Sequence, residues 1–470
     1  MSFQLSPGVD EKKVFVAKFS ELSDRYDPDM VLFRRKIHGF RHPVERMHKF
    51  FSTSPQYGAN EKGVERETSE EPRYVRITDI NEYGLLSEEL GATAETIEPQ
   101  YLLQENDLLF ARSGNTVGKS YIHKTANVDY PCFFAGYLIR LRFNEKRVLP
   151  DYIFALTQLP YYKSWVKAIQ RASGQPNINA QEYSNLDVCI APMPVQVQVV
   201  KRLDEAYAAK AKKDAQAKAQ LAGIDALLLA ELGITTAPAL PNTIQNRIFI
   251  RQFSEVTGGR FAAPAHWKKL NLSSPIYPSV KLVDLVDINP TFSPNLQDED
   301  EVSFVPMEAV SEISGQIASH YARLFGGAGT YTQFQEGDLL WAKITPCMEN
   351  GKSAIATNLV NDFGFGSTEF HVFRPKTDAI DVRFLHALFR LQILRDHARL
   401  NFGGSAGHQR VDKDYFLKLS IPLPEIEEQR RICNAIDKAK IEATKLFAAA
   451  QSELEGARAE IEAMILGNPI

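Results

Sequence analysis

The segment RSGNTVGKS, residues 112–120, contains residue types that could bind phosphate. A phosphate-binding loop of the pattern G-x-x-x-x-G-K-[ST] follows a buried strand and opens a helix, so that its backbone amides converge on the phosphates. Gly118, Lys119 and Ser120 fit the end of this pattern, but Gly114 stands one residue too close to Gly118. The residues that follow are rich in aromatic and β-branched types, which predicts strands rather than a helix. The sequence therefore argues against a nucleotide site in this segment.

Two other segments could carry the chemistry of a DNA adenine methyltransferase. NPTF, residues 289–292, resembles the Asn-Pro-Pro-Phe motif of those enzymes, and FGFGS, residues 363–367, resembles a glycine-rich S-adenosylmethionine loop. Thr291 stands where the motif has its second proline, and no β-α-β alternation surrounds the glycines. A self-contained methyltransferase is therefore kept only as an alternative. The chain also has no HExxH motif, no nucleophile elbow and no cysteine or histidine spacing typical of a metal site.

The RSGNTVGKS segment fits a turn that contacts DNA better than a turn that holds a nucleotide. Gly114 and Gly118 permit a backbone with positive φ, and short polar side chains between them suit contacts with bases or phosphates. The arginine could donate two hydrogen bonds to a guanine or a phosphate. A second polar loop follows about 55 residues later, and its Asn and Gln side chains could pair with adenine edges. The residues proposed to contact DNA in this half of the chain are Arg112, Ser113, Asn115, Thr116, Lys119, Arg171, Gln175 and Asn177.

An ordinary solvated turn explains any one of these residues equally well, because Asn and Gln also cap turns without a ligand. The charge distribution favours the DNA interpretation. Residues 112–171 contain ten Lys or Arg and three Asp or Glu, although the whole chain has a formal net charge of −4. A basic region of this kind is typical of a surface that attracts phosphates.

The chain contains an internal repeat. FQEGDLLWAKITPCMENGKSAI, residues 334–355, matches LQENDLLFARSGNTVGKSYI, residues 103–122. The match extends in both directions, and AGHQRV from Ala406 meets SGQPNI from Ser173. A repeat this long indicates two homologous domains rather than a solenoid. The residues proposed to contact DNA in the second copy are Lys343, Thr345, Asn350, Lys352, Gln409 and Arg410.

Each copy ends in a long helical segment. Apolar residues recur at steps of three and four from about residue 195 to 232 and from about 425 to 466, in a composition rich in Ala, Glu, Lys and Leu. A helix of about 40 residues is roughly 60 Å long, which favours pairing of the two helices with each other. The sequence predicts a first domain at 1–193, a helix at 194–233, a linker at 234–247, a second domain at 248–423 and a helix at 424–467.

Length and composition are those of a cytoplasmic protein outside the membrane. The 470 residues are too many for one ordinary core. No apolar run is long enough to span a bilayer, and the N-terminus lacks the apolar core of a signal peptide. The four cysteines are far apart, which is typical of a reducing compartment.

The ordered set of motifs resembles the DNA-specificity (S) subunits of Type I restriction–modification systems. The motifs are D-x-L-x-x-R-x-G-x-x-x-G-K from Asp107, S-G-Q-P-N-I-N from Ser173, and a P-x-P element that precedes each long helix. The second copy departs at the turn, where Lys343 replaces the arginine and TPCMEN replaces GNTV. The resemblance covers the whole chain in the same order, twice.

The resemblance implies an α+β fold with two target-recognition domains, joined by two long helices that form an antiparallel coiled coil with pseudo-twofold symmetry. Each domain would bind one half of a bipartite, asymmetric double-stranded DNA target and one methyltransferase subunit, and restriction/translocase subunits would join the same assembly. The chain itself would be non-catalytic and bind no cofactor, with S-adenosylmethionine, ATP and Mg²⁺ held by the partner subunits. A coiled-coil scaffold that binds no DNA is the remaining alternative, favoured by the mildly acidic total charge.

Overall fold

The computed structural model describes residues 16–17, 28–37, 40–87, 89–170, 176–235, 243, 250, 270–291, 293–403 and 409–466. The described residues do not include the proposed DNA contacts Arg171 and Gln175, the side chain of Asn115 or most of the linker at 234–247. The chain forms two compact units. Unit 1 comprises Met1–Lys213 and Ala448–Ile470, and unit 2 comprises Asp214–Phe447. The two long helices therefore contribute to both units.

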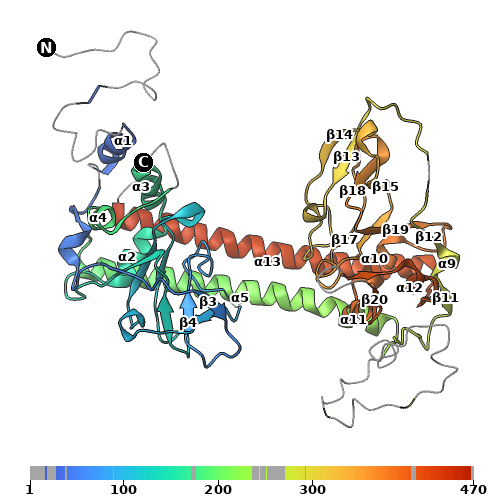
Figure 1. The fold of residues 1–470 in the computed structure, drawn as a ribbon, viewed down its shortest axis with the longest axis horizontal. Coiled ribbons are helices and arrows are strands. Elements are labelled where there is room, and N and C mark those ends of the chain that lie inside the picture. Colours follow the sequence, from blue (N-terminus) through green and yellow to red (C-terminus); the bar gives the residue numbers. More distant parts are fainter. Residues whose placement is uncertain are drawn as a thin grey trace. The chain divides into compact units, whose positions relative to one another are not determined.

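Unit 1 contains two four-stranded sheets, and β3 and β4 of the second sheet are labelled in Figure 1. The first has the order β2-β9-β6-β7 and is antiparallel throughout. The second has the order β3-β5-β4-β8, in which β4 and β8 are parallel. The strands are β2 (Gln56–Tyr57), β3 (Gly63–Glu65), β4 (Arg73–Val75), β5 (Ala92–Ala94), β6 (Leu108–Ala111), β7 (Ser120–Ile122), β8 (Cys132–Phe134) and β9 (Leu138–Leu141).

Unit 2 repeats this plan. Its first sheet has the order β12-β19-β16-β17, and its second has the order β14-β13-β18-β15, with β13 and β18 parallel. Ala342 on β16 faces Phe370 on β19, as Ala111 on β6 faces Leu138 on β9. The strands are β12 (Val286–Ile288), β13 (Glu301–Val305), β14 (Tyr321–Leu324), β15 (Thr332–Gln335), β16 (Leu339–Ala342), β17 (Ser353–Ile355), β18 (Phe363–Gly366) and β19 (Phe370–Pro375).

Short helices and ribbons complete each unit. In unit 1 these are α1 (Pro28–Ile37), α2 (Pro150–Thr157), α3 (Pro160–Ile169), α4 (Ala180–Ser184), and the ribbon of β1 (Val44–Arg46) with β10 (Asp187–Cys189). In unit 2 they are α9 (Leu282–Leu285), α10 (Val382–Arg390), α11 (Gln392–Leu400), α12 (Lys413–Leu417), and the ribbons of β11 (Ser279–Lys281) with β22 (Ser420–Pro422) and of β20 (Phe402–Gly403) with β21 (Arg410–Val411).

A buried aspartate stabilises the turn that leads into the central hairpin of each unit. Asp107 is 1% exposed, accepts a hydrogen bond from the backbone amide of Gln104 at 2.9 Å, and binds Arg140 and Arg142. In unit 2, Asp338 accepts a bond from the amide of Gln335 at 2.9 Å and binds Arg374. The aspartate of the D-x-L motif therefore has a structural role in both copies.

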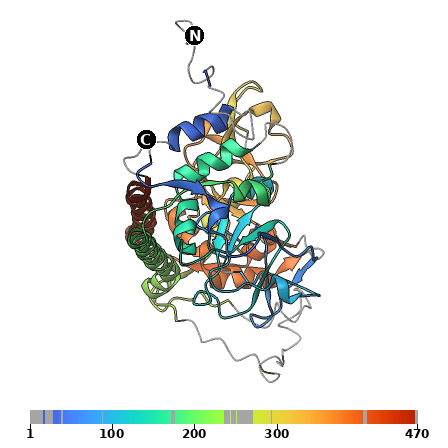
Figure 2. The same cartoon turned by 90° about the vertical axis from the view of Figure 1, so that its left-hand side faces the viewer.

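The long helices are α5 (Met193–Glu231) and α13 (Ile426–Leu466), drawn green and red in Figure 1. In both units their segments lie side by side (Figure 2) and run antiparallel. Arg202 of α5 forms an ion pair with Glu460 of α13 in unit 1, and Glu231 forms one with Arg431 in unit 2. Apolar residues of the predicted stripe are buried on both helices, among them Leu203, Ala217, Leu228, Ile432, Ile436, Ala443, Leu454 and Ile461.

A buried glutamine anchors the start of each long helix to its own domain. Gln196 accepts a hydrogen bond from the amide of Leu149 and donates one to the carbonyl of Ala191. Gln429 accepts from the amide of Asp381 and donates to the carbonyl of Pro424. The structure confirms the expected fold class, which is two homologous α+β domains joined by long paired helices.

Candidate nucleic-acid interface

The RSGNTVGKS segment is the loop of the β6–β7 hairpin. It contains one turn of 3-10 helix, η4 (Gly114–Thr116), and then enters β7 without an α-helix. Gly114 has φ +73° and Gly118 has φ +87°, so both adopt the left-handed backbone that favours glycine. A Cβ on Gly118 would also lie 2.6 Å from the side chain of Val166. The geometry is that of a tight hairpin turn rather than a phosphate-binding loop.

The hairpin loop and the second predicted loop of unit 1 lie against each other. Ser113 and Asn177 form an antiparallel β-bridge. The amide of Gly114 donates to the carbonyl of Pro176 at 3.1 Å, and the amide of Ile178 donates to the carbonyl of Arg112 at 2.8 Å. We call this contact of 112–114 with 176–178 joint 1. Two loops separated by about sixty residues in the sequence therefore form one surface.

Arg112 is held at joint 1 by two side chains. Its guanidinium carbon lies 4.8 Å from the centre of the Tyr57 ring, and its Nε donates to Asn177 Oδ1 at 3.4 Å. Tyr57 is fixed in turn, because its hydroxyl accepts a hydrogen bond from the amide of Ala180. Tyr137, 63% exposed, adjoins the same place through its carbonyl, which accepts from the amide of Arg112 at 3.0 Å. Neither tyrosine was predicted, since an isolated aromatic residue carries no motif.

Unit 2 forms the same joint with different side chains. The amide of Thr345 donates to the carbonyl of Gln409 at 3.0 Å, and the amide of Val411 donates to the carbonyl of Lys343 at 2.9 Å. Ile344 and Arg410 form the β-bridge. We call this contact of 343–345 with 409–411 joint 2. Its hydrogen bonds have the register predicted by the sequence repeat, so Arg410 occupies the place of Asn177, and Lys343 that of Arg112.

Arg410 is engaged by a carboxylate at joint 2. Its Nε donates to Glu369 Oε2 at 2.8 Å and its Nη2 to Glu369 Oε1 at 2.6 Å. The hydrogen bond from Arg410 lowers the pKa of Glu369 below its ordinary value. Glu369 lies in the turn before β19, and its carbonyl accepts from the amide of Lys343 at 2.9 Å. The sequence repeat did not identify Glu369, because the residue that Glu369 contacts, Arg410, is about forty positions later in the sequence.

The two motif lysines share an internal role. Lys119 Nζ donates to the carbonyl of Ile80 at 2.9 Å, and Lys352 Nζ donates to the carbonyl of Met307 at 3.2 Å. Each lysine thus ties its hairpin to the turn that follows β4 or β13. Three further proposed residues have side-chain partners within the protein: Thr116 with the carbonyl of Ser113, Thr345 with Glu349, and Asn350 with Glu312.

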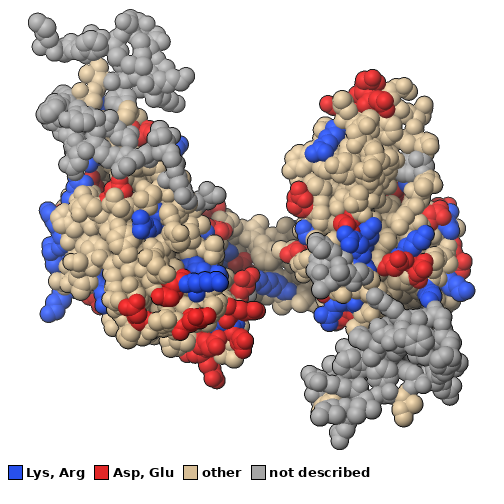
Figure 3. Space-filling model, viewed as in Figure 1, with Lys and Arg blue, Asp and Glu red and all other residues tan. Residues whose placement is uncertain are grey.

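The count of basic residues overstates the charge available to DNA in unit 1. Arg140 and Arg142 are both committed to buried Asp107, and Lys124 forms an ion pair with Asp151 at 2.8 Å. Arg147 donates to the carbonyl of Lys49 and lies over the ring of Phe50. Figure 3 shows carboxylates gathered on the lower edge of unit 1, and few charged groups on the part of unit 2 that carries β13, β14, β15 and β18. The face drawn in Figure 3 therefore shows no basic surface that extends over a whole unit.

The two segments that resembled methyltransferase motifs have structural roles. Asn289 has φ +52°, accepts a hydrogen bond from the amide of Val372 at 2.9 Å, and lies 3.1 Å from a ring nitrogen of His371. Gly366 lies within β18, where a Cβ would approach the carbonyl oxygen of Val305 to 2.0 Å. The glycines of FGFG thus allow close packing within a sheet, and they do not stand at a strand-to-helix turn.

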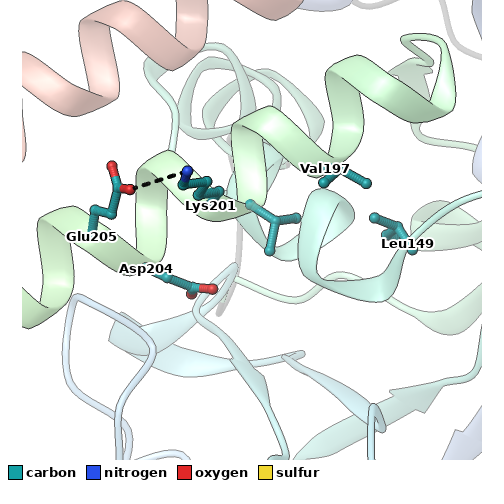
Figure 4. A pocket seen from close by; sticks show the side chains of 6 residues that line it. Leu149, Val197, Lys201, Asp204 and Glu205 are labelled. Atoms are coloured by element: carbon teal, nitrogen blue, oxygen red, sulfur yellow. Dashed lines mark ion pairs between the residues drawn. The ribbon is translucent and has the colours of Figure 1, made fainter.

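A shallow pocket of about 320 Å³ lies on unit 1 beside α5 (Figure 4). Leu149, Val197 and Val200 form its apolar wall, and Lys201, Asp204 and Glu205 are its charged members. Lys201, the cation of this lining, lies 3.9 Å from the carboxylate of Glu205.

Within the described residues there is no group of three or more His, Cys, Asp or Glu that could hold a metal ion. No described helix is long and apolar enough to cross a membrane.

Comparisons with known proteins agree with the repeat. Residues 64–221 and 277–455 each match the family described as Type I restriction modification DNA specificity domain. The specificity subunit of Type I restriction enzyme EcoAI from Escherichia coli is 38% identical over 152 residues, which is 32% of this chain and 26% of that protein. The specificity subunit of EcoEI from the same organism is 32% identical over 179 residues, which is 38% of this chain and 28% of that protein. The matched part thus spans less than a third of each relative.

One solved structure has a similar fold along nearly the whole chain. It concerns complex assembly and conformational transition of the type I R-M system, and it superposes with a TM-score of 0.52 and 14% sequence identity. The superposition covers 92% of this chain and 100% of that chain. At this identity the likeness shows the fold alone.

Proposed function

This chain belongs to the Type I restriction modification DNA specificity family, and on that premise we propose that it is the sequence-reading subunit of a Type I restriction–modification complex. Unit 1 reads one half of a bipartite double-stranded DNA target through joint 1, and unit 2 reads the other half through joint 2. The half-sites differ because the joints carry different donors and acceptors. The expected target is therefore asymmetric.

The observation that carries this proposal is the repeated joint. Both units bring together a hairpin loop and a distant polar loop with the same backbone hydrogen bonds, while the side chains at equivalent positions differ. Arg112 and Asn177 stand in joint 1 where Lys343 and Arg410 stand in joint 2. A shared frame with changed polar side chains suits two readers of different base sequences, since base edges are distinguished by their donors and acceptors. A turn that only stabilised the fold would not require different polar side chains in the two units.

The proposed subunit is non-catalytic. Methylation of adenine and ATP-driven cleavage belong to partner methyltransferase and restriction/translocase subunits, which bind S-adenosylmethionine, ATP and Mg²⁺. The structural roles of Asn289 and Gly366 support this division, because they account for the two methyltransferase-like segments without catalysis. The expected location is the cytoplasm, where the DNA is.

Two copies of one methyltransferase subunit would need similar surfaces on both units. The pocket beside α5 does not meet this condition. Gln196 and Gln429 are equivalent, which places Arg430 where unit 1 has Val197, and Asp437 where it has Asp204. In unit 2 this region carries Arg383, which pairs with Asp381 and with Asp437 at 3.6 Å. We therefore do not assign the pocket to methyltransferase docking.

A binding experiment separates this function from that of a coiled-coil scaffold. The chain would be co-purified with its methyltransferase subunit, and the affinity of the complex for duplex DNA measured between about 50 and 200 mM salt. Phosphate contacts release counterions, so a DNA reader loses affinity steeply as salt increases. A scaffold that binds no DNA would add nothing to the affinity of the methyltransferase alone at any of these salt concentrations.

A further inference from the structure

Among the residues of joint 1 that the structure describes, no ion pair corresponds to the Arg410–Glu369 pair of joint 2. The same backbone hydrogen bond joins the amide of Lys343 to the carbonyl of Glu369 and the amide of Arg112 to the carbonyl of Tyr137. Glu369 and Tyr137 are therefore equivalent in the two units. An acid that binds Arg410 in unit 2 thus stands where unit 1 has the exposed ring of Tyr137.

The contact between Glu369 and Arg410 is bidentate and lies at the surface. Both carboxylate oxygens accept from one edge of the guanidinium, at 2.8 Å from Nε and 2.6 Å from Nη2. The Arg410 side chain is 43% exposed and that of Glu369 is 22% exposed. Because the guanidinium is planar, two parallel hydrogen bonds fix the orientation of the whole group. The edge not used by Glu369 is then directed away from the carboxylate.

We propose that Glu369 is a positioning residue that fixes the guanidinium of Arg410, and that it thereby sets the base preference of the half-site read by unit 2. This inference rests on the proposed function. An arginine side chain that is already oriented loses less conformational freedom on binding, and a guanidinium presented end-on matches the two acceptors of guanine. Glu369 acts through Arg410 and is not itself expected to contact a base.

The two units would then orient a guanidinium by different means and from opposite arms of the same joint. In unit 1 the guanidinium belongs to Arg112 on the hairpin arm, where it lies over the ring of Tyr57 and donates to the side-chain oxygen of Asn177. In unit 2 it belongs to Arg410 on the second arm, and a carboxylate holds it. This difference gives a physical reason why one frame can read two unlike half-sites.

The charge of Glu369 makes its role measurable. A carboxylate near DNA is repelled by phosphates, so its removal should leave binding to unrelated DNA equal or tighter. At the same time the loss of orientation should weaken the preference for the cognate base pair. A residue that only maintained the fold would instead lower affinity for every sequence when it is replaced.

The test uses the full chain in complex with its methyltransferase and a set of duplexes that carry each base pair in turn at every position of both half-sites. Glu369→Gln, Glu369→Asp, Arg410→Ala and the double variant Glu369→Gln/Arg410→Ala are compared with the wild type. Glu427→Gln is the matched control, because Glu427 also forms an exposed pair with an arginine, Arg430, at 2.7 Å in the first turn of α13. The ratio of cognate to altered-site affinity is measured for each position.

The expected result is a loss of discrimination of about tenfold at one base pair of one half-site in both Arg410→Ala and Glu369→Gln. The double variant should lose no more than Arg410→Ala alone, Glu369→Asp should retain part of the preference, and the other half-site and Glu427→Gln should match the wild type. Glu369→Gln with wild-type preference beside an impaired Arg410→Ala would overturn the positioning role. So would a uniform loss of affinity for all duplexes. A wild-type complex that discriminates no base pair would instead refute the proposed function itself.

Discussion

Replacing Arg112 with alanine should impair DNA reading and leave the fold nearly intact. The internal contacts of Arg112 are weak, because its hydrogen bond to Asn177 is 3.4 Å long and its stacking on Tyr57 is at a partly exposed site. An exposed cation–π contact contributes about 0.5–1 kcal/mol. We therefore expect the free energy of unfolding to decrease by less than about 1 kcal/mol, a change that urea denaturation can bound.

The expected loss in binding is larger than the loss in stability. A bidentate contact between arginine and a base contributes about 1–3 kcal/mol of discrimination, which corresponds to about 5- to 150-fold in affinity. Titration of the methyltransferase complex with the cognate duplex and with duplexes altered at one position should locate this loss in a single half-site. The conservative variant Arg112→Lys reproduces the residue of unit 2 and should recover phosphate attraction without recovering the base preference.

Arg112 would have no part in recognition if the alanine variant bound the cognate duplex with unchanged affinity and unchanged base preference. A uniform loss for all duplexes, accompanied by a lower free energy of unfolding, would also contradict the account. In that case Arg112 would support the hairpin rather than contact DNA. Lys343→Ala in unit 2 is the matched variant, and its effect should fall in the other half-site.

Three further outcomes are expected. Asp107→Ala removes the anion from Arg140, which is 7% exposed, and should lower the free energy of unfolding of unit 1 by about 3–5 kcal/mol in urea denaturation; a loss under 1 kcal/mol would show that the pair is dispensable. Burial lowers the pKa of His386 to about 3, whereas an unfolded histidine has a pKa of about 6.5. Below about pH 6.5 the unfolded chain therefore binds a proton that the folded chain does not. The contribution of His386 to stability should be full above about pH 6.5 and fall by up to about 1.4 kcal/mol per pH unit below it. His386→Gln should reduce the dependence of the free energy of unfolding on pH, measured by urea denaturation, and an unchanged dependence would mean that other groups cause it. Inserting four residues after Lys212 should alter the spacer of the methylated DNA motif and leave both half-sites unchanged, and a constant spacer would mean that α5 does not set it.

Much of the fold could be predicted because local sequence patterns indicate it and the same set of patterns occurs twice. The a/d stripes predicted the two long helices. The alignment of AGHQRV with SGQPNI predicted that Arg410 is equivalent to Asn177, and the backbone hydrogen bonds of the two joints confirm this equivalence. Gly118 and Ser120 were matched to Gly351 and Ser353 by the Gly-Lys-Ser sequence that both copies share. The structure supplies the reason: both glycines have positive φ, and both serines are buried, one bonded to Thr157 and the other to His386.

The candidate site was less accessible to sequence reasoning, because the partner of a polar side chain is decided by tertiary contacts. Lys119 resembles a phosphate ligand in the sequence, yet its ammonium group is bonded to the carbonyl of Ile80. The sequence suggests that Arg140 and Arg142 add positive charge to the surface, but both form ion pairs with Asp107 in the folded chain. Tyr57 and Glu369 belong to no motif, and only the folded chain brings them to Arg112 and Arg410.

The most direct test of the central claim is the methylation pattern of DNA in cells that express this chain with its methyltransferase subunit. Long-read sequencing would locate every methylated adenine in the genome. The account predicts a two-part asymmetric motif with a constant gap and one methylated adenine in each half, on opposite strands. Variants at Arg112 and at Arg410 should alter different halves of it. A continuous motif, or methylation that is unchanged when this chain is deleted, would contradict the account.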